Sequence, residues 1–588
     1  MCGIAGLIST QKNSPVSLKN LSRALKHRGG DDEGCFVNEA KGVYLAHNRL
    51  SIIDLSAAAH QPLFNENKTV AALLNGEIYN FVDLRASLAK KGHKFSSHSD
   101  AEVIVHAYEE WGEDFVKHLR GMFAVALWDE KENTLILARD PIGIKPLYYL
   151  KDHERFIFAS ELQAFWSLGD DVFSPQINME AARLLLLFPF IADDEATILQ
   201  NVKKLPPAHI LVFKNKQVTL KRYWQLAYNE EEAIHDFPAA AEVFEGKIQE
   251  VLALHLQSDV KMGVFLSGGV DSSFLASLAA KISDVPLSVF TAVFGHPLDE
   301  QILATSFAAQ IKAEHIVLHV DMKDVARNLQ SIILRFDDLS TIDGGLITLS
   351  LLAEKAKERG IKVMLNGEGA DEIFCGYPWF SLAHFPYGVL PNFLKNRLWY
   401  YRFSKNVNTY RSEEGVKIFN SLINRNEKDM LRRISQFEIE HQLPNNFLMK
   451  VDKATMTHGV ETRVPYLDKE IVQFAYNLPD HFKRNSHEDK VLLRSVAAKY
   501  LPHEIAYRRK RGFLFPFERF LDENRDQLKD YLFDPHAICS QLLTKKEIDG
   551  LLNFKIKLPF FFERQRQTLL WKLFILELLR GGVKASRT

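Results

Sequence analysis

The chain has 588 residues, and its 73 lysines and arginines almost balance its 74 aspartates and glutamates, so the formal net charge is −1 with histidine neutral. At about 150 residues per domain, this length allows roughly four domain-sized units or two large domains. Charged residues make up 25% and apolar residues 46% of the chain, as in ordinary globular proteins. This composition excludes a disordered chain, and the balanced charge argues against a nucleic-acid partner bound through a broad basic face.

The cysteine content excludes two further classes of protein. Four cysteines in a chain of this length are too few for a disulfide framework. No two of them form a CxxC pair, so we do not expect a structural zinc site of the usual spacing. The cysteines are Cys2, Cys35, Cys375 and Cys539.

Targeting and membrane signals are weak. The first residues, MCGIAGLIST, have no basic region and only a short apolar run, so we do not expect a signal peptide. The longest apolar stretch, near residues 181–192, contains Arg183 and Pro189 and is too short to span a bilayer. We expect a cytoplasmic protein without a membrane partner.

The first 160 or so residues combine short β-rich runs with a few helices. Turn signals such as Asn75-Gly76 and Asp140-Pro141 separate the runs, and this pattern is typical of an α+β domain. Two amphipathic segments predict helices near residues 80–91 and 100–111. The predicted strands cover residues 69–74, 122–128, 134–138 and 156–159.

The pattern changes after residue 204. A hairpin-like stretch, ILVFKNKQVTL, is followed by an acidic, polar segment at residues 229–236. We therefore expect a first domain over residues 2–210, a linker over 211–237 and a second domain over 238–588.

The second domain alternates helices and strands. Strands are predicted at residues 264–266, 287–294 and 361–365, with a helix at 274–281. This alternation favours a parallel sheet covered by helices on both faces. From about residue 380 the pattern is mostly helical, and we expect the amphipathic run at 565–579 to be a packed helix.

Cys2 is a candidate nucleophile. If Met1 is removed, a thiol and a free α-amine lie on the same residue, and an α-amine has a reference pKa of about 7.7–8.0. The amine can therefore accept the thiol proton, directly or through a water, as in other N-terminal nucleophiles.

Several motifs accompany Cys2: MCGIAG, HRGGDDEG, HNRLSIIDLS, HQP, LNGEIYN, SDAEVI and RDPIGIKPLYY. Together they resemble the glutaminase domain of class II amidotransferases over residues 2–210. Gly30 departs from the family, which usually has proline there. The resemblance implies an N-terminal-nucleophile α/β/β/α fold, with Cys2, Asn75 and Gly76 as catalytic residues. It implies that glutamine is bound by Arg49, Ile53, Asn75, Gly76, Glu77 and Asp100.

The implied roles agree with the chemistry of these residue types. A guanidinium such as that of Arg49 can hold the glutamine carboxylate through paired hydrogen bonds. Glu77 and Asp100 can hold the glutamine ammonium group. The Asn75 side chain and the Gly76 N–H can form an oxyanion hole for attack by the Cys2 sulfur.

A glycine-rich heptad, SGGVDSS at residues 267–273, follows a predicted strand and precedes a helix. Such a loop can hold phosphate through backbone N–H groups and hydroxyls. It resembles the pyrophosphate loop of ATP pyrophosphatases, which adenylate a substrate and release pyrophosphate. An acid inside a phosphate loop requires a cation, so Asp271 indicates Mg²⁺.

A third motif, NGEGADE at residues 366–372, also lies between a predicted strand and a helix. In an open α/β sheet both loops would lie at the carboxyl ends of strands, where ligands bind. By resemblance, Asp371 is the second Mg²⁺ ligand and Glu368 lies beside the acyl-adenylate and the entering ammonia. Asn366 replaces the family's serine.

Further matches are VDKATM at residues 451–456, GVETRVPYLD at 459–468 and RxKxGF at 508–513. With these, residues 2–520 resemble the glutamine-hydrolysing asparagine synthetases, whose second domain is a parallel-sheet α/β ATP pyrophosphatase with a helical C-terminal part. Lys490 occupies the position of a family lysine that meets the α-phosphate. The implied ATP-binding residues are Leu266, Ser267, Gly268, Gly269, Asp271, Ser272, Val293, Asn366 and Gly367.

The resemblance implies an enzyme that uses three small molecules, namely glutamine, Mg-ATP and aspartate. A homodimer is the oligomeric state that we expect. The segment at 337–345, DDLSTIDGG, lies where many family members have a proline-rich stretch near the acceptor site. Two alternatives therefore stay open. One is the same amidation of another carboxylate, in a polysaccharide or secondary-metabolite pathway, and the other is a non-catalytic interaction protein that retains the fold.

Overall fold

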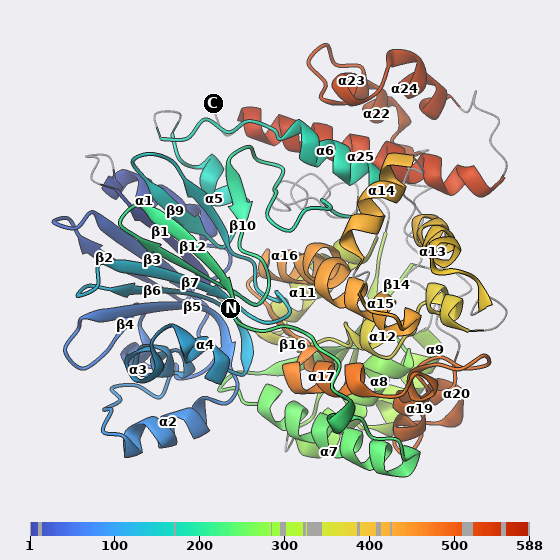
Figure 1. The fold of residues 1–588 in the computed structure, drawn as a ribbon, viewed down its shortest axis with the longest axis horizontal. Helices are drawn as coiled ribbons and strands as arrows, with labels where there is room; N and C mark the ends of the chain where they lie inside the picture. The colour runs from blue at the N-terminus through green and yellow to red at the C-terminus, as the bar shows by residue number, and fades with distance from the viewer. Residues whose placement is uncertain are drawn as a thin grey trace.

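Two six-stranded antiparallel sheets face each other in the N-terminal part of the computed structural model (Figure 1). The first sheet has the order β10 (Val202–Lys204), β8 (Tyr148–Lys151), β9 (Phe156–Ala159), β1 (Gly3–Ile8), β3 (Val43–Arg49) and β2 (Asp32–Asn38). The second has the order β12 (Gln217–Arg222), β11 (His209–Lys214), β7 (Thr134–Arg139), β6 (Gly121–Asp129), β5 (Val70–Ile78) and β4 (Leu63–Phe64).

The structure describes a defined set of residues. They are 2–9, 14–169, 172–283, 285–294, 301–321, 325, 344–384, 389–406, 413–423, 426–508, 521, 523–553 and 560–585. Residues 337–343 of the segment expected near the acceptor, and most of the RxKxGF motif, lie outside this set.

Helices cover the outer face of each sheet. α1 (Ser14–Leu25) and α5 (Leu162–Trp166) pack on the first sheet. α2 (Phe81–Lys90), α3 (Val103–Trp111) and α4 (Phe115–His118) pack on the second. Side chains such as Ile4, Trp128 and Phe158 form the core between the sheets. The order of layers is α/β/β/α, which confirms the predicted fold class.

This layering explains the sequence of the central strands. β5 is buried at every residue, and β6 at every residue except Gly121. Because one face of these strands meets the opposite sheet and the other meets helices, both faces need apolar side chains. They therefore read as continuous apolar runs rather than as an alternating pattern.

The expected boundary at residue 210 is wrong. β11 pairs with β7, and β12 pairs with β11, so residues 211–222 belong to the second sheet and not to a linker. The sequence predicts a hairpin here. It does not show that the first strand of this hairpin, β11, pairs with β7, which lies far away along the chain.

The C-terminal part contains a five-stranded parallel sheet, as predicted. Its order is β15 (Glu314–His319), β14 (Ser288–Val293), β13 (Met262–Phe265), β16 (Val363–Leu365) and β17 (Glu461–Arg463). The chain runs outward from β13 through β14 to β15, and then returns to β16 on the other side. This reversal places the carboxyl ends of β13 and β16 at a topological switch point, where open α/β sheets bind ligands.

Helices cover both faces of this sheet. α7 (Phe237–His255), α8 (Val270–Ile282), α17 (Lys469–Asn477) and α19 (Val491–Ala497) share one apolar core with the sheet. α11 (Gly344–Glu358) packs on the other face, against Phe265 and Phe290. The other helices are α6 (Met179–Leu187), α9 (Gln301–Gln310), α12 (Ala370–Ile373), α13 (Asn392–Asn406), α14 (Glu413–Leu422), α15 (Met430–Phe437), a π-helical stretch (Glu438–Phe447), α16 (Leu448–Met456), α18 (Asp480–Lys483), α20 (His503–Ala506), α22 (Arg525–Leu532), α23 (Cys539–Leu542), α24 (Lys545–Leu552) and α25 (Phe560–Ala585).

The last helix returns to the N-terminal domain. α25 lies beside α6, as Figure 1 shows at the top of the molecule. The buried Lys572 ammonium donates hydrogen bonds to the carbonyls of Leu185 (2.7 Å) and Phe188 (2.6 Å). The predicted amphipathic run therefore forms a packed helix. No helix in the described part of the chain has the length and apolar character needed to cross a membrane.

Candidate active site

Cys2 lies immediately before β1 and is only 6% exposed. Its neighbour Gly3 pairs with Asn48 near the end of β3, and this register brings Cys2 close to Arg49. Burial raises the pKa of the Cys2 thiol to about 11, although the Arg49 charge opposes this effect. The thiol is therefore protonated at neutral pH, and it needs a base to become a nucleophile.

Asn75 lies on β5 and is fully buried. Neither its side-chain nitrogen nor its oxygen has a hydrogen-bond partner among the described residues. A buried unsatisfied polar group costs about 1–3 kcal/mol, so its retention points to a role with a ligand. The next residue, Gly76, has φ of +144°, and a Cβ atom there would lie 1.9 Å from the Met122 carbonyl oxygen. Only glycine fits this position.

Two buried carboxyl groups follow in the same region. Asp100 begins a short 3₁₀ turn (Asp100–Glu102), and its Oδ2 accepts a hydrogen bond from the Ile78 N–H at 2.9 Å. Burial raises the pKa of Asp100 to about 6. Burial, Glu461 and Asp100 also raise the pKa of Glu77 well above its usual range. Buried carboxyl groups with raised pKa values favour a bound cation, such as the ammonium group of an amino acid.

The structure also brings Arg49 and Ile53 together. The Arg49 guanidinium donates to the carbonyls of Ile53 (3.3 Å), Ser56 (3.2 Å) and Asp54. These bonds hold the loop after β3 in place. The guanidinium must break some of these hydrogen bonds before it can donate to a ligand carboxylate.

A buried ion cluster joins Cys2 to the C-terminal domain, and sequence reasoning assigned it no role. The Arg28 guanidinium donates to the Cys2 carbonyl at 3.1 Å, to Glu161 at 2.6 Å and to Asp452 at 2.9 Å. Lys145 lies 3.5 Å from Asp452. Arg28, Lys145, Glu161 and Asp452 are all buried, so these contacts are screened little by solvent. Arg28 and Asp452 both belong to motifs that carry the family resemblance. Their place in these motifs is the only indication in the sequence that the two residues have a role.

A second buried ion pair between the two domains involves Arg463 of β17. Nη2 of the fully buried Arg463 lies 3.4 Å from Oε1 of Glu77, and its Nε lies 2.6 Å from Glu461. Arg463 also donates to the carbonyls of His255 (2.6 Å) and Gln257 (2.7 Å). A strand of the parallel sheet therefore supplies the counter-ion of a carboxylate in the first site.

The glycine-rich loop after β13 turns sharply into α8. Gly268 has φ of +75°, and α8 begins at Val270. The Ser272 hydroxyl accepts a hydrogen bond from the Ser267 N–H at 3.1 Å and lies 3.0 Å from the Ser267 hydroxyl. The loop thus leads directly into a helix N-terminus, which favours bound anions.

The second loop packs directly on the first. A Cβ atom at Gly367 would lie 3.0 Å from the Ser272 nitrogen. Asn366 donates from its N–H to the Arg463 carbonyl at 2.9 Å, which extends the pairing of β16 and β17. Leu266 follows β13, and Val293 ends β14, at the same edge of the sheet. The predicted ATP-binding residues therefore gather at the switch point.

Lys490 bridges the two predicted metal ligands. Its ammonium lies 2.7 Å from Asp271 Oδ2 and 2.7 Å from Asp371 Oδ1. Burial alone would lower the pKa of Lys490, but the two carboxylates outweigh burial and raise it. Glu368 is half-buried in the loop that leads to Asp371. Burial raises the pKa of Tyr377, and the charges of Glu372, Asp371 and Glu368 add to this effect.

The carboxylates of Asp271 and Asp371 already converge on one cation, the Lys490 ammonium. Mg²⁺ is commonly bound by one or two carboxylates together with substrate phosphates. The donor set therefore fits Mg²⁺.

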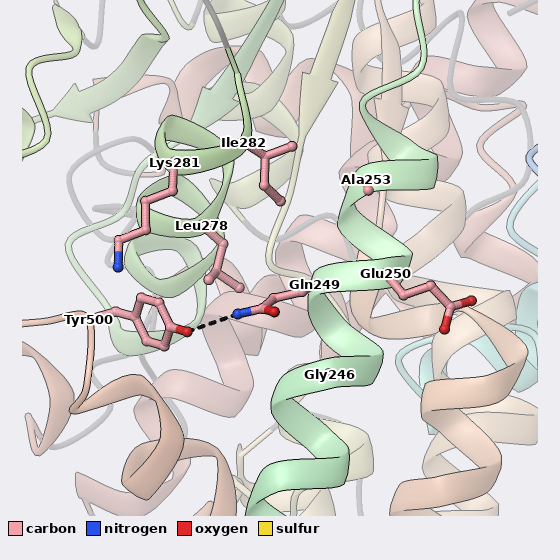
Figure 2. Close-up of a pocket in the computed structure, with 8 residues that line it drawn as sticks. All are labelled: Gly246, Gln249, Glu250, Ala253, Leu278, Lys281, Ile282 and Tyr500. Atoms are coloured by element: carbon pink, nitrogen blue, oxygen red, sulfur yellow. Dashed lines mark hydrogen bonds between the residues drawn. The ribbon is translucent and has the colours of Figure 1, made fainter.

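A surface hollow of about 550 Å³ lies elsewhere, between α7, α8 and Tyr500 (Figure 2). Gln249 donates to the Tyr500 hydroxyl at 2.9 Å across it. None of the residues predicted for either site lines this hollow. It also lacks the buried, convergent polar groups that mark both sites described above.

Comparison with known proteins agrees with this geometry. A family profile described as a glutamine amidotransferase domain matches residues 1–224, and one described as asparagine synthase matches residues 244–580. A glutamine-hydrolysing asparagine synthetase of Bacillus subtilis, number 1, is 30% identical over 90% of this chain and 89% of its own length. The chain belongs to the glutamine-hydrolysing asparagine synthetase family.

Other members of the asparagine synthetase family show similar likeness. Synthetase 3 of Bacillus subtilis is 29% identical and covers 95% of both chains. Synthetase 3 of Arabidopsis thaliana is 31% identical over 87% of this chain and 78% of its own length. Among solved structures, a glutamine PRPP amidotransferase of Bacillus subtilis is 13% identical, with a TM-score of 0.31, over 75% of this chain and 96% of its own. The likeness to the two Bacillus synthetases covers at least 90% of this chain, and so both domains.

Proposed function

We propose that the protein is a glutamine-dependent asparagine synthetase. It hydrolyses glutamine to glutamate and ammonia, activates aspartate with Mg-ATP, and forms asparagine, AMP and pyrophosphate. The observation that carries the proposal is the contact of Arg28 with both the Cys2 carbonyl and Asp452. One buried side chain thus links the candidate nucleophile to the domain that carries the nucleotide loops. Membership of the asparagine synthetase family supports the reaction.

The first half-reaction takes place at Cys2. After removal of Met1, the α-amine accepts the thiol proton, and the sulfur attacks the side-chain carbonyl carbon of glutamine. The Asn75 side chain and the Gly76 N–H stabilise the oxyanion. The C–N bond breaks, ammonia leaves with the proton, and a γ-glutamyl thioester remains. Water then hydrolyses the thioester to glutamate and regenerates the thiol.

Binding of glutamine uses the charged groups around Cys2. Glu77, Asp100 and the Ile53 carbonyl accept hydrogen bonds from the ammonium group, while the Arg49 guanidinium donates to the carboxylate. Glu77 is itself held by Arg463 at 3.4 Å.

The second half-reaction takes place at the switch point. The aspartate β-carboxylate attacks the α-phosphorus of ATP, and pyrophosphate leaves from the loop that contains Ser267, Gly268 and Gly269. Asp271 and Asp371 would hold Mg²⁺, which neutralises charge on the departing pyrophosphate. Lys490 then turns from these carboxylates toward the α-phosphate. The product is β-aspartyl-AMP.

Ammonia completes the reaction. It attacks the carbonyl carbon of β-aspartyl-AMP, Glu368 accepts a proton, and AMP leaves. Ammonia must reach this carbon as the neutral molecule, because ammonium has no free electron pair. Transfer of ammonia between the two sites inside the protein would meet this requirement.

The test is a panel of carboxylates with ATP and either glutamine or ammonium chloride. We expect aspartate to support pyrophosphate release and amide formation. A different carboxylate that supports both, with aspartate inert, would assign the alternative acceptor. If no carboxylate supports pyrophosphate release, the protein is better explained as a non-catalytic interaction protein that retains the fold.

Two further expectations belong to this proposal. We place the enzyme in the cytoplasm, where ATP and aspartate are available, and we expect a homodimer. Light scattering coupled to size-exclusion chromatography measures the mass of the assembly against 67.3 kDa for one chain.

A further inference from the structure

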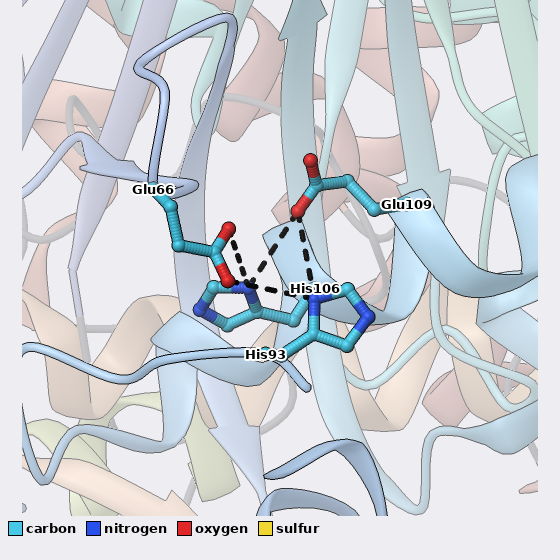
Figure 3. Close-up of side chains that lie close together, drawn as sticks. All are labelled: Glu66, His93, His106 and Glu109. Atoms are coloured by element: carbon cyan, nitrogen blue, oxygen red, sulfur yellow. Dashed lines mark ion pairs between the residues drawn. The ribbon is translucent and has the colours of Figure 1, made fainter. Parts of the chain in front are cut away.

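Four potential metal ligands converge on the outer face of the N-terminal domain (Figure 3). Glu66 follows β4, His93 follows α2, and His106 and Glu109 lie on α3. Each side chain offers one ligand atom, and these atoms all lie within 4.8 Å of one another. We call these four residues the His–Glu cluster.

The distances within the cluster do not match hydrogen bonds. Nδ1 of His106 lies 3.6 Å from both Glu66 and Glu109, and Nδ1 of His93 lies 3.7 Å from both. A hydrogen bond between nitrogen and oxygen normally spans about 2.7–3.2 Å. Ligands at about 2.1 Å from a tetrahedral zinc ion lie about 3.4 Å from one another. The spacing is therefore closer to that of ligands around an ion.

His106 adds an independent observation. Its side chain is fully buried, and neither ring nitrogen has a hydrogen-bond partner among the described residues. Nδ1 is directed toward the oxygens of Glu66 and Glu109 (Figure 3). A buried imidazole without a hydrogen bond is unfavourable, and a metal ion bound at Nδ1 would reduce this cost.

The other ring nitrogens face carboxylates. Nε2 of His106 lies 3.8 Å from Glu102, and Nε2 of His93 lies 3.7 Å from Glu110. Glu102 is itself fixed by the N–H and hydroxyl groups of Ser96 and Ser97, at 2.6–2.8 Å. Metal-binding histidines commonly have a carboxylate beside their second ring nitrogen. At 3.7–3.8 Å, Glu110 and Glu102 occupy that position without a hydrogen bond to the ring.

The two glutamates are oriented in a similar way. Glu66 Oε1 accepts a hydrogen bond from the Lys94 N–H at 2.8 Å, which leaves Oε2 toward His106. Glu109 Oε1 accepts from the Asn65 side chain at 2.6 Å, which leaves Oε2 toward both histidines. Glu66 thus faces His93 through Oε1 and His106 through Oε2, while Glu109 faces both histidines through Oε2 alone.

We propose that the His–Glu cluster binds one divalent transition-metal ion of the zinc type. Two imidazoles and two carboxylates suit this class of ion. Four protein ligands leave no open position, so the site is structural and not catalytic. The ion connects the turn before β5 and the segment after α2 to α3. The segment after α2 leads to Asp100, so the ion also supports one wall of the glutamine site.

The experiment uses the full chain with Cys2→Ala, which removes the catalytic thiol as a competing zinc ligand. Excess Mg²⁺ is present so that zinc does not occupy Asp271 and Asp371. Zinc bound after dialysis is measured by elemental analysis, and the melting temperature is measured with and without Zn²⁺. We expect one equivalent of zinc and a higher melting temperature with it.

The variants Glu66→Gln and Glu109→Gln remove one ligand each with little change of shape. Their side chains are 35% and 25% exposed, so the substitutions should not prevent folding. Each should lose the bound zinc and the zinc-dependent rise in melting temperature. Glu102→Gln, which changes a partner of His106 and not a ligand, should lower zinc affinity about 10–100-fold. The matched control is His235→Gln, because His235 is an exposed histidine outside the cluster that lies 3.3 Å from Glu230, and this variant should bind zinc like the parent.

The proposal is overturned if the parent binds no zinc, or if the Glu66 and Glu109 variants bind as much zinc as the parent. The cluster would then be a set of histidine–glutamate ion pairs.

Discussion

The two candidate sites satisfy their polar groups in opposite ways. In the first site, the Asn75 side chain is buried without a hydrogen-bond partner among the described residues, and Glu77 and Asp100 are buried carboxyl groups with raised pKa values. In the second site, the Lys490 ammonium pairs with both Asp271 and Asp371. The first site pairs Glu77 with Arg463 but leaves the Asn75 amide unused, whereas in the second site one lysine is the counter-ion of both carboxylates.

This difference follows from the charge of the substrates. Glutamine carries no net charge, so a site for it can be built in advance from fixed dipoles and one compensating pair of charges. ATP brings several negative charges together with a cation, and empty carboxylates facing each other would repel. The second site therefore has to exchange an internal ion pair for the substrate. The predictions below test this contrast, from the largest expected effect to the smallest.

Asn75→Ala should lower the rate of glutamine hydrolysis about 10²–10³-fold, because an oxyanion-hole donor is lost. It should not lower the melting temperature, since the native amide makes no hydrogen bond with the described residues that folding could lose. Steady-state glutaminase assays and thermal unfolding measure the two effects.

The matched control for Asn75 is Asn445→Ala. Asn445 is also buried, but its side chain accepts from Lys204 at 2.9 Å and donates to the His441 carbonyl at 3.0 Å. Its loss should destabilise the protein by about 1–3 kcal/mol. If both variants lose the same stability, Asn75 has a structural partner and is not held ready for substrate.

Lys490→Met should lower the free energy of unfolding by about 3 kcal/mol, because Asp271 and Asp371 lose their counter-ion. Mg²⁺ without nucleotide should restore part of the lost melting temperature, since it can replace the ammonium. Lys490→Arg keeps the charge and should lose less stability. A Lys490→Met protein with the melting temperature of the parent would show that the two carboxylates do not depend on the lysine.

The pH dependence of glutamine hydrolysis tests Asp100, whose pKa burial raises to about 6. Below this pH the carboxyl group is protonated and no longer attracts the glutamine ammonium. The kcat/KM for glutamine should therefore fall as the pH drops below 6, by about tenfold per pH unit at the limit. Asp100→Asn should have a low kcat/KM that does not fall further as the pH drops below 6. If kcat/KM falls by the same factor in both proteins, the group that titrates near pH 6 is not Asp100.

Gln249→Ala changes the hollow of Figure 2 and should alter stability by no more than about 0.5 kcal/mol, as exposed substitutions usually do. Both half-reactions should keep their rates, because the hollow binds neither substrate. Glutaminase and pyrophosphate-release assays measure this. A clear rise in the KM of ATP or aspartate would place a substrate at the hollow.

Much of the fold could be predicted from the sequence because its signals are local. Apolar runs marked β5 and β6, and the alternation of helices and strands after residue 237 marked the parallel sheet. The layer order came from the family resemblance, since apolar runs alone do not say which face meets a sheet and which meets helices. The hairpin at β11 and β12 was misassigned because its partner strand, β7, lies about 70 residues earlier along the chain.

The candidate sites were predictable only in part. Motifs contained most of the residues that were assigned a role by resemblance, with Leu266, Val293 and Lys490 outside them, but they did not indicate how residues from different motifs pair. The contacts of Arg28 with Asp452 and of Arg463 with Glu77 join positions hundreds of residues apart, so only the structure shows them. The His–Glu cluster was missed for the same reason. Its local signal was His106 and Glu109, three residues apart on one helix, which on its own is common.

The most direct test of the two-site account is the activity of the full-length Cys2→Ala variant with two nitrogen donors. Asparagine formation is measured with glutamine and, separately, with ammonium chloride, each with ATP, Mg²⁺ and aspartate. Because the thiol serves only to release ammonia, the account predicts that synthesis from glutamine is lost and synthesis from ammonium is kept. Loss of both activities in a variant that melts like the parent, or retention of glutamine-dependent synthesis, would contradict it.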